Sequence, residues 1–279
     1  MSLIEHDFVA SQWESALPVL MDYIAIPAKS PMFDADWAKN GYLDLVVRNA
    51  ATWVEAQKVP GLKLEVLRLE GRTPVIFFEV PATKPGSQDT VVLYGHLDKQ
   101  PEFNGWRADL GPWTPKYENG LLYGRGGADD GYAVYASLTA IMALDQQGIP
   151  RPRCVGIIET CEESGSRDLL PYVDALRPRL GDVGLVICLD SGAGNYDQLW
   201  LTTSLRGNIT GALKVEILTE GVHRFEGTVN QYTGDGIMAL FGAPIAHEDH
   251  AQRACWAALH LRDQLRRYAE ELKRTHGLN

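Results

Sequence analysis

The stretch VVLYGHLD, at residues 91–98, decides how the rest of this chain can be interpreted. A run of apolar, β-prone residues ends at Gly95, and His96 and Asp98 follow. This pattern predicts a buried strand with His96 and Asp98 at its carboxyl end, where open α/β sheets collect ligands and catalytic groups. Side chains two residues apart in an extended segment point the same way, so Asp98 can hold one ring nitrogen of His96 while the other binds a metal. A core histidine with its hydrogen bonds satisfied, next to an aspartate in a turn, would explain the same sequence.

The overall composition and charge limit the class of protein and the partners that this chain can have. The chain has 279 residues, 45% hydrophobic and 22% charged residues, and a formal net charge of −10, which is typical of a globular protein of one or two domains. The negative charge argues against nucleic acid or an anionic membrane as the main partner. The four cysteines lack any CxxC spacing, and there is no signal peptide or long apolar run, so we expect a cytoplasmic protein.

Hydrophobic periodicity predicts an α/β fold with a mixed, largely parallel sheet flanked by helices. A small α+β segment, made of a β-hairpin and a long helix, is expected at the C-terminus. Pro18 is expected to kink or bound the first helix, and Pro171 to interrupt the fourth. The predicted helices lie at residues 8–24, 41–58, 132–147 and 168–180, and the predicted strands at 63–69, 75–80, 91–94, 154–159 and 184–189.

Acidic side chains follow two further predicted strands. Glu162 and Glu163 come after the strand at 154–159, and Asp190 ends the strand at 184–189. Desolvating two adjacent carboxylates is costly unless a cation or a shared proton compensates. Asp129 follows a glycine-rich loop where a helix begins; taken alone, it is a common helix cap. Together with His96, these residues favour a metal site at one edge of the sheet.

Four motifs, GHLDKQP, GRGGADDG, CEESGS and LDSG, resemble in order and spacing those of the dinuclear zinc metallopeptidases of the aminoacylase, carnosinase and glutamate carboxypeptidase superfamily. The resemblance covers residues 8–223. It implies that His96 and Asp190 bind one metal, that Glu163 binds the other, and that Asp129 bridges both. Zn²⁺ is the implied metal, with Mn²⁺ or Co²⁺ as substitutes.

The resemblance also implies catalytic roles. Asp98 would orient His96, and Glu162 would be the general base that deprotonates the attacking water. The implied substrates are dipeptides or N-acyl amino acids, cleaved at an amide next to a carboxylate. His223 would reach the reacting carbonyl across a dimer, so the resemblance is compatible with a homodimer. Many relatives have a lysine where this chain has Gly131.

The same resemblance divides the chain. Residues 1–205 would be the N-terminal part of a catalytic domain, and residues 206–223 the start of a lid domain. Beyond residue 223 the peptidase pattern stops, and the histidine that completes the second metal site in relatives has no counterpart. We therefore expect about one tightly bound metal per chain.

Residues 224–279 resemble an internal piece of a class III nucleotide cyclase catalytic domain, with Asp235 as one of its metal-binding aspartates. The chain is thus expected to be a chimera. Asp-Gly between two β-prone runs is also the commonest hairpin turn, so the same letters fit an ordinary hairpin. Three functions follow: an impaired metallopeptidase, a noncatalytic interaction protein on a peptidase fold, or a purine nucleotide cyclase.

Overall fold

The computed structural model describes residues 6–195, 197–203, 222, 224–233, 236–241 and 248–276. The chain divides into two compact units, Met1–Thr203 and Ser204–Asn279, and each is described by itself. The boundaries expected at residues 205 and 223 from the resemblance stay a prediction. No helix in the described ranges is long and apolar enough to cross a bilayer.

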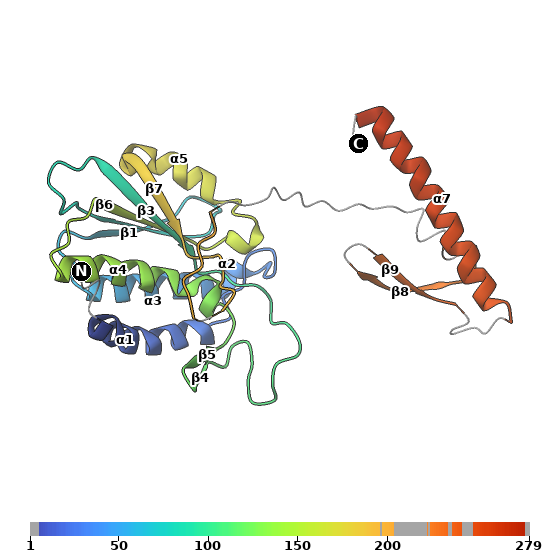
Figure 1. Cartoon of the computed structure of the whole chain (residues 1–279), viewed down its shortest axis with the longest axis horizontal. Coiled ribbons are helices and arrows are strands. Elements are labelled where there is room, and N and C mark those ends of the chain that lie inside the picture. Colours follow the sequence, from blue (N-terminus) through green and yellow to red (C-terminus); the bar gives the residue numbers. More distant parts are fainter. Residues whose placement is uncertain are drawn as a thin grey trace. The chain divides into compact units, whose positions relative to one another are not determined.

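The first unit is built on a five-stranded mixed sheet in the order β1-β2-β6-β3-β7. The strands β6, β3 and β7 run parallel to one another, whereas β1 pairs antiparallel with β2 and β2 pairs antiparallel with β6. The predicted mixed, largely parallel α/β sheet is confirmed (Figure 1). The strands are β1 Lys63–Leu67, β2 Val75–Val80, β3 Asp89–His96, β6 Arg153–Glu159 and β7 Asp182–Cys188.

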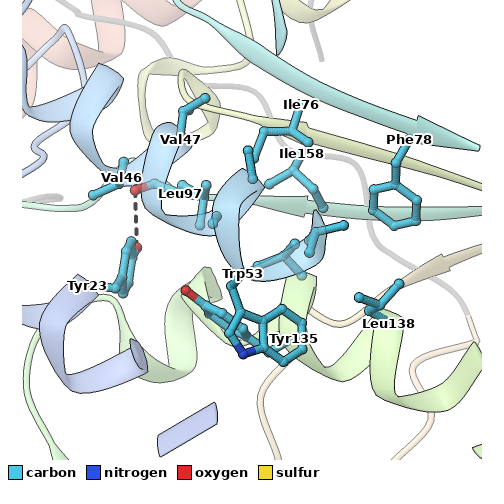
Figure 2. Packing of buried hydrophobic residues seen from close by; sticks show 14 of the residues in the cluster. Tyr23, Val46, Val47, Trp53, Ile76, Phe78, Leu97, Tyr135, Leu138 and Ile158 are labelled. Carbon is cyan, nitrogen blue, oxygen red and sulfur yellow. Dashed lines mark hydrogen bonds between the residues drawn. The ribbon is translucent and has the colours of Figure 1, made fainter. Parts of the chain in front are cut away.

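Helices cover both faces of this sheet. The helices α1 (His6–Ala25), α3 (Tyr42–Ala56) and α4 (Ala133–Gln146) pack on one face, and α5 (Leu169–Leu180) packs on the other (Figure 1). The larger core lies under the first three helices, where Trp53 packs edge-on against Tyr135 with ring centroids 4.9 Å apart (Figure 2). Shorter elements complete the unit: α2 Trp37–Asn40, β4 Lys116–Glu118, β5 Leu121–Tyr123, and the single turns Gly127–Gly131 and Glu162–Ser164.

Two prolines act differently from expectation. Pro18 lies inside α1 and does not end it, because the flanking residues Leu20 and Ile24 are buried and their packing outweighs the lost backbone hydrogen bond. Pro171 lies in the first turn of α5, where a backbone N–H has no intrahelical partner, so the helix runs through it uninterrupted. Pro18 is therefore not a helix boundary, and the interruption expected at Pro171 is not present.

The second unit contains the expected hairpin and long helix. The strands β8 (Thr228–Thr233) and β9 (Gly236–Leu240) pair antiparallel, and α7 spans His250–His276. The Phe225 ring meets the His260 ring edge-on at 5.9 Å, and Arg253 pairs with Glu226 at 2.7 Å. These contacts link α7 to the segment before the hairpin. The expected first lid strand, at residues 206–223, lies almost entirely outside the described residues.

Candidate metal centre

Candidate ligands from four separate segments converge at the carboxyl edge of the parallel strands. His96 is the last residue of β3, and Asp190 follows β7. Glu162 and Glu163 form the turn after β6, and Asp129 lies in the turn before α4. Parallel strands end at the same edge of a sheet, so their polar end residues meet although they are far apart in sequence.

The imidazole of His96 is the centre of this cluster. Its side chain is fully buried, and its Nε2 has no hydrogen-bond partner in the described part of the chain. That nitrogen lies 3.5 Å from Asp129 Oδ1, 3.5 Å from Asp190 Oδ2 and 3.9 Å from Glu162 Oε2. A buried, unpartnered nitrogen facing several carboxylate oxygens has the donor chemistry of a divalent metal site. The residues present therefore fit a bound Zn²⁺.

The same residues form two overlapping groups of metal-type donors. In each group, every residue offers one ligand atom, and these atoms all lie within 4.8 Å of one another. The first group is His96, Asp129 and Asp190, and the second is His96, Glu162 and Glu163. The structure thus brings together all five residues that the sequence nominated as ligands or base, with His96 common to the two groups.

Asp98 is placed differently from the simplest expectation. Nδ1 of His96 lies 3.0 Å from the backbone carbonyl oxygen of Asp98 and 3.6 Å from its carboxylate. The carboxylate, which is fully buried, instead accepts the backbone N–H groups of Glu162 at 3.1 Å and Glu163 at 3.0 Å. Asp98 therefore contacts both the imidazole and the turn that carries the paired glutamates.

The local electrostatics reflect crowding of like charges. Burial raises the pKa of Glu163 to about 7, although a hydrogen bond from Gln100 opposes the shift. Burial also raises the pKa of Glu162. Burial alone lowers the pKa of His96, but the surrounding carboxylates outweigh it and the net shift is upward. The neighbouring imidazole of His96 lowers the pKa of Asp129. Such a cluster is stabilised by a cation among its carboxylates.

Two buried acids near the cluster were not nominated from sequence. Asp130 accepts the backbone N–H of His96 at 3.3 Å, and burial raises its pKa to about 7. Glu159, at the end of β6, accepts hydrogen bonds from Tyr94 at 2.7 Å and from Ser166 at 2.8 Å. Ser166 follows the Glu162–Ser164 turn, so Glu159 ties that turn to the sheet. The sequence carried a signal for each of them. Asp130 is the second aspartate of the ADD sequence, and Glu159 is the acid that ends an apolar strand.

Two sequence candidates cannot be placed. His223, expected to bind substrate, and Asp235, expected to bind metal in a cyclase-like hairpin, both lie outside the described residues. Gly131, the position at which relatives have a lysine, lies against Tyr23: a Cβ there would come within 2.1 Å of the Tyr23 ring. The local packing therefore leaves no room for a side chain at this position.

Two curated dipeptidases are similar in sequence to part of this chain. The rat Beta-Ala-His dipeptidase is 30% identical over 185 residues, which cover 64% of this chain and 37% of that protein. The Cysteinylglycine-S-conjugate dipeptidase of Corynebacterium striatum is 31% identical over 179 residues, which cover 62% of this chain and 38% of that protein. The chain thus spans less than two fifths of the length of these relatives.

A solved structure and a family description extend the comparison. The crystal structure of human carnosine dipeptidase 1 superposes with a TM-score of 0.50 at 24% identity, covering 70% of this chain and 40% of that one, which supports the fold. The description "Peptidase family M20/M25/M40" matches residues 92–273. That match runs through most of the segment expected to be a cyclase fragment, and the comparisons give no support to a cyclase or to a chimera. The chain belongs to the M20/M25/M40 peptidase family.

Proposed function

We propose that this chain is a metal-dependent hydrolase that cleaves amide bonds in dipeptides or N-acyl amino acids. The observation that carries the proposal is the buried Nε2 of His96, which has no protein hydrogen-bond partner among the described residues and faces the carboxylates of Asp129 and Asp190 at 3.5 Å. Histidine with two carboxylates is the ligand count of a catalytic zinc site.

The proposed metal ligands are divided as the resemblance implies. His96, Asp129 and Asp190 would hold one ion, and Asp129 with Glu163 would hold a second. When bound, Zn²⁺ supplies a Lewis acid that polarises the scissile carbonyl and lowers the pKa of water. Mn²⁺ or Co²⁺ has ligand preferences close enough to substitute.

Glu162 is the proposed general base. Its carboxylate is one-third exposed, so a water molecule and a substrate can reach it, and Oε2 lies 3.9 Å from His96 Nε2. In this role Oε2 takes a proton from the attacking water and then delivers it to the leaving amine nitrogen. The two backbone hydrogen bonds that Asp98 accepts hold the Glu162 backbone in place for both transfers.

The substrate class is inferred from the relatives. Both curated relatives described above carry the name dipeptidase, so small peptides are the proposed substrates. We further propose a catalytic part within residues 1–205, a lid beginning at residues 206–223, substrate contact by His223 in a homodimer, and a cytoplasmic location.

Hydrolysis assays test this proposal. Metal-stripped protein is incubated with β-alanyl-histidine or an N-acetyl amino acid, with Zn²⁺, Mn²⁺ or Co²⁺ added, and the released amine is quantified. We expect release that depends on the metal and disappears on chelation. A folded chain that binds Zn²⁺ but releases no amine from either substrate would instead support a noncatalytic interaction protein on a peptidase fold.

A further inference from the structure

Lys99 is a fully buried lysine immediately after the His96–Asp98 segment. Its ammonium nitrogen Nζ donates to the carbonyl oxygens of Tyr23 at 2.7 Å, Ile26 at 2.7 Å and Ile24 at 3.3 Å. These carbonyls lie at the carboxyl end of α1, where helical carbonyls lack intrahelical donors and the helix dipole is negative. Lys99 therefore caps α1 from a segment more than seventy residues further along the chain.

Tyr23 strengthens the link between α1 and the end of β3. The Lys99 ammonium lies 3.9 Å from the centroid of the Tyr23 ring, which is a cation–π contact. The Tyr23 hydroxyl donates to the carbonyl oxygen of Leu97 at 3.1 Å, and Figure 2 shows this bond between the helix and the segment next to His96. The residue before Asp98 and the residue after it are thus both bound to the last turn of α1.

The loop that carries Asp129 closes over the same lysine. A Cβ on Gly126 would lie 2.8 Å from the Lys99 side chain, and Gly126 has a φ of +83°, so a glycine fits both the space and the backbone there. The carbonyl of Gly126 accepts the N–H of Gly131 at 2.8 Å, which closes the turn around Asp129. Lys99 consequently contacts the supports of both His96 and Asp129.

The buried ammonium of Lys99 is compensated by backbone carbonyl acceptors and not by an acidic side chain in the described part of the chain. No carboxylate in the described part of the chain forms an ion pair with it, and burial lowers its pKa to about 6. Three carbonyl acceptors nevertheless match the three donors of an ammonium, whereas a neutral amine has only two. A buried polar group in such a constrained position rigidifies its surroundings when every donor is satisfied.

We propose that Lys99 is a positioning residue that sets the separation between His96 and Asp129 by fixing both of their segments to the end of α1. The inference rests on the metal centre proposed above. It predicts that removing the ammonium weakens metal binding although no ligand is changed. Residues that support metal ligands typically contribute about 10- to 100-fold to metal affinity.

The test is Co²⁺ and Zn²⁺ titration of Lys99→Met, with Lys29→Met as the matched control. Lys29 forms a β-bridge with Lys99, but its side chain is partly exposed and pairs with Glu102 at 3.0 Å. We expect Lys99→Met to bind Co²⁺ about 10- to 100-fold more weakly and with a changed visible absorption spectrum, which reports ligand geometry. Lys29→Met should keep the wild-type affinity and spectrum.

Distinct outcomes separate this inference from the proposed function. Wild-type protein that takes up no metal contradicts the metal centre. Wild-type affinity and an unchanged Co²⁺ spectrum in folded Lys99→Met contradict the role of Lys99 alone. If Lys99→Met does not fold, amide hydrogen exchange in the wild-type protein provides the test. Coupling between the metal centre and the end of α1 is reciprocal, so bound metal should slow exchange at Ile24 and Ile26. Unchanged exchange at the end of α1 would overturn the inference.

Discussion

The carboxylate of Asp98 holds the backbone of Glu162. Asp98 Oδ1 accepts the Glu162 N–H at 3.1 Å, and its second oxygen accepts the N–H of the following residue at 3.0 Å. The end of β3 is thereby fixed to the turn after β6, and the backbone of the proposed base cannot move away from His96 without breaking charge-assisted hydrogen bonds. Asp98 thus connects the histidine and the base in one buried unit.

Asp98→Asn tests this connection. An amide offers one acceptor oxygen in place of two, so one backbone N–H in the turn would face an NH₂ group and lose its partner. We expect a loss of about 1–3 kcal/mol in the free energy of unfolding, measured in urea, together with a large loss of hydrolysis. Asp174→Asn, in an exposed pair with Arg177, should change stability by less than about 0.5 kcal/mol. Equal effects of the two substitutions would contradict the role given to Asp98.

Glu162→Gln tests whether Glu162 is the general base or a metal ligand. The amide cannot take a proton, so hydrolysis should be abolished while metal content, measured by atomic absorption, stays at the wild-type value. Asp129→Ala should remove the metal, because Asp129 belongs to the His96–Asp129–Asp190 group. Loss of metal from Glu162→Gln comparable to that from Asp129→Ala would show that Glu162 is a ligand and that the roles of Glu162 and Glu163 are exchanged.

Gly131→Ala is expected to destabilise the fold. Its Cβ would lie within 2.1 Å of the Tyr23 ring, and neither the buried ring nor the turn can yield without disturbing other contacts. Overpacking of this kind costs about 1–3 kcal/mol, measurable as a lower urea midpoint. Gly184→Ala is the matched control, since the nearest atom to a Cβ there lies at 3.8 Å. A stable Gly131→Ala would mean that Tyr23 does not occupy this position.

Glu79 should make stability depend on pH in the acid range. Partial burial raises its pKa, but hydrogen bonds from Arg179 and Arg153 outweigh burial and the net pKa is lowered. A lowered folded-state pKa stabilises the protein above the unfolded-state pKa, roughly 4.3, and this contribution is lost as pH falls through the folded-state value. Urea unfolding of wild type and Glu79→Gln should therefore differ at pH 7 and converge below about pH 4. A difference that is constant from pH 7 to pH 3 would contradict the ion pairing.

Most of the candidate cluster was predictable, because His96, Asp190 and the Glu162–Glu163 pair lie at or just after the ends of apolar runs. Once β3, β6 and β7 are assigned as parallel strands, topology places His96, Glu163 and Asp190 at one edge of the sheet. Asp129 needed the resemblance, because an aspartate at a helix start is usually a cap. The candidate donors other than Asp129 therefore follow from local pattern and general sheet geometry.

The supporting contacts were not predictable in the same way. Lysine is almost never fully buried, so Lys99 in the LDKQP sequence is expected in a solvent-exposed loop. Its acceptors lie at the end of α1, and no periodicity in either segment indicates that they meet. Likewise, the spacing of His96 and Asp98 indicated that these residues meet, but not that the Asp98 carboxylate also accepts a hydrogen bond from a turn 64 residues away. Such contacts depend on tertiary packing.

Calorimetric titration of metal-stripped protein with Zn²⁺ tests the central claim most directly. In the proposed assignment, His96, Asp129 and Asp190 would supply three ligands to one ion, while Glu163 has no second imidazole beside it in the described part of the chain. We therefore expect about one tightly bound Zn²⁺ per chain, absent in Asp129→Ala. A folded wild-type chain without tight Zn²⁺ binding, or Asp129→Ala with undiminished affinity, would contradict the assignment of this cluster as a metal centre.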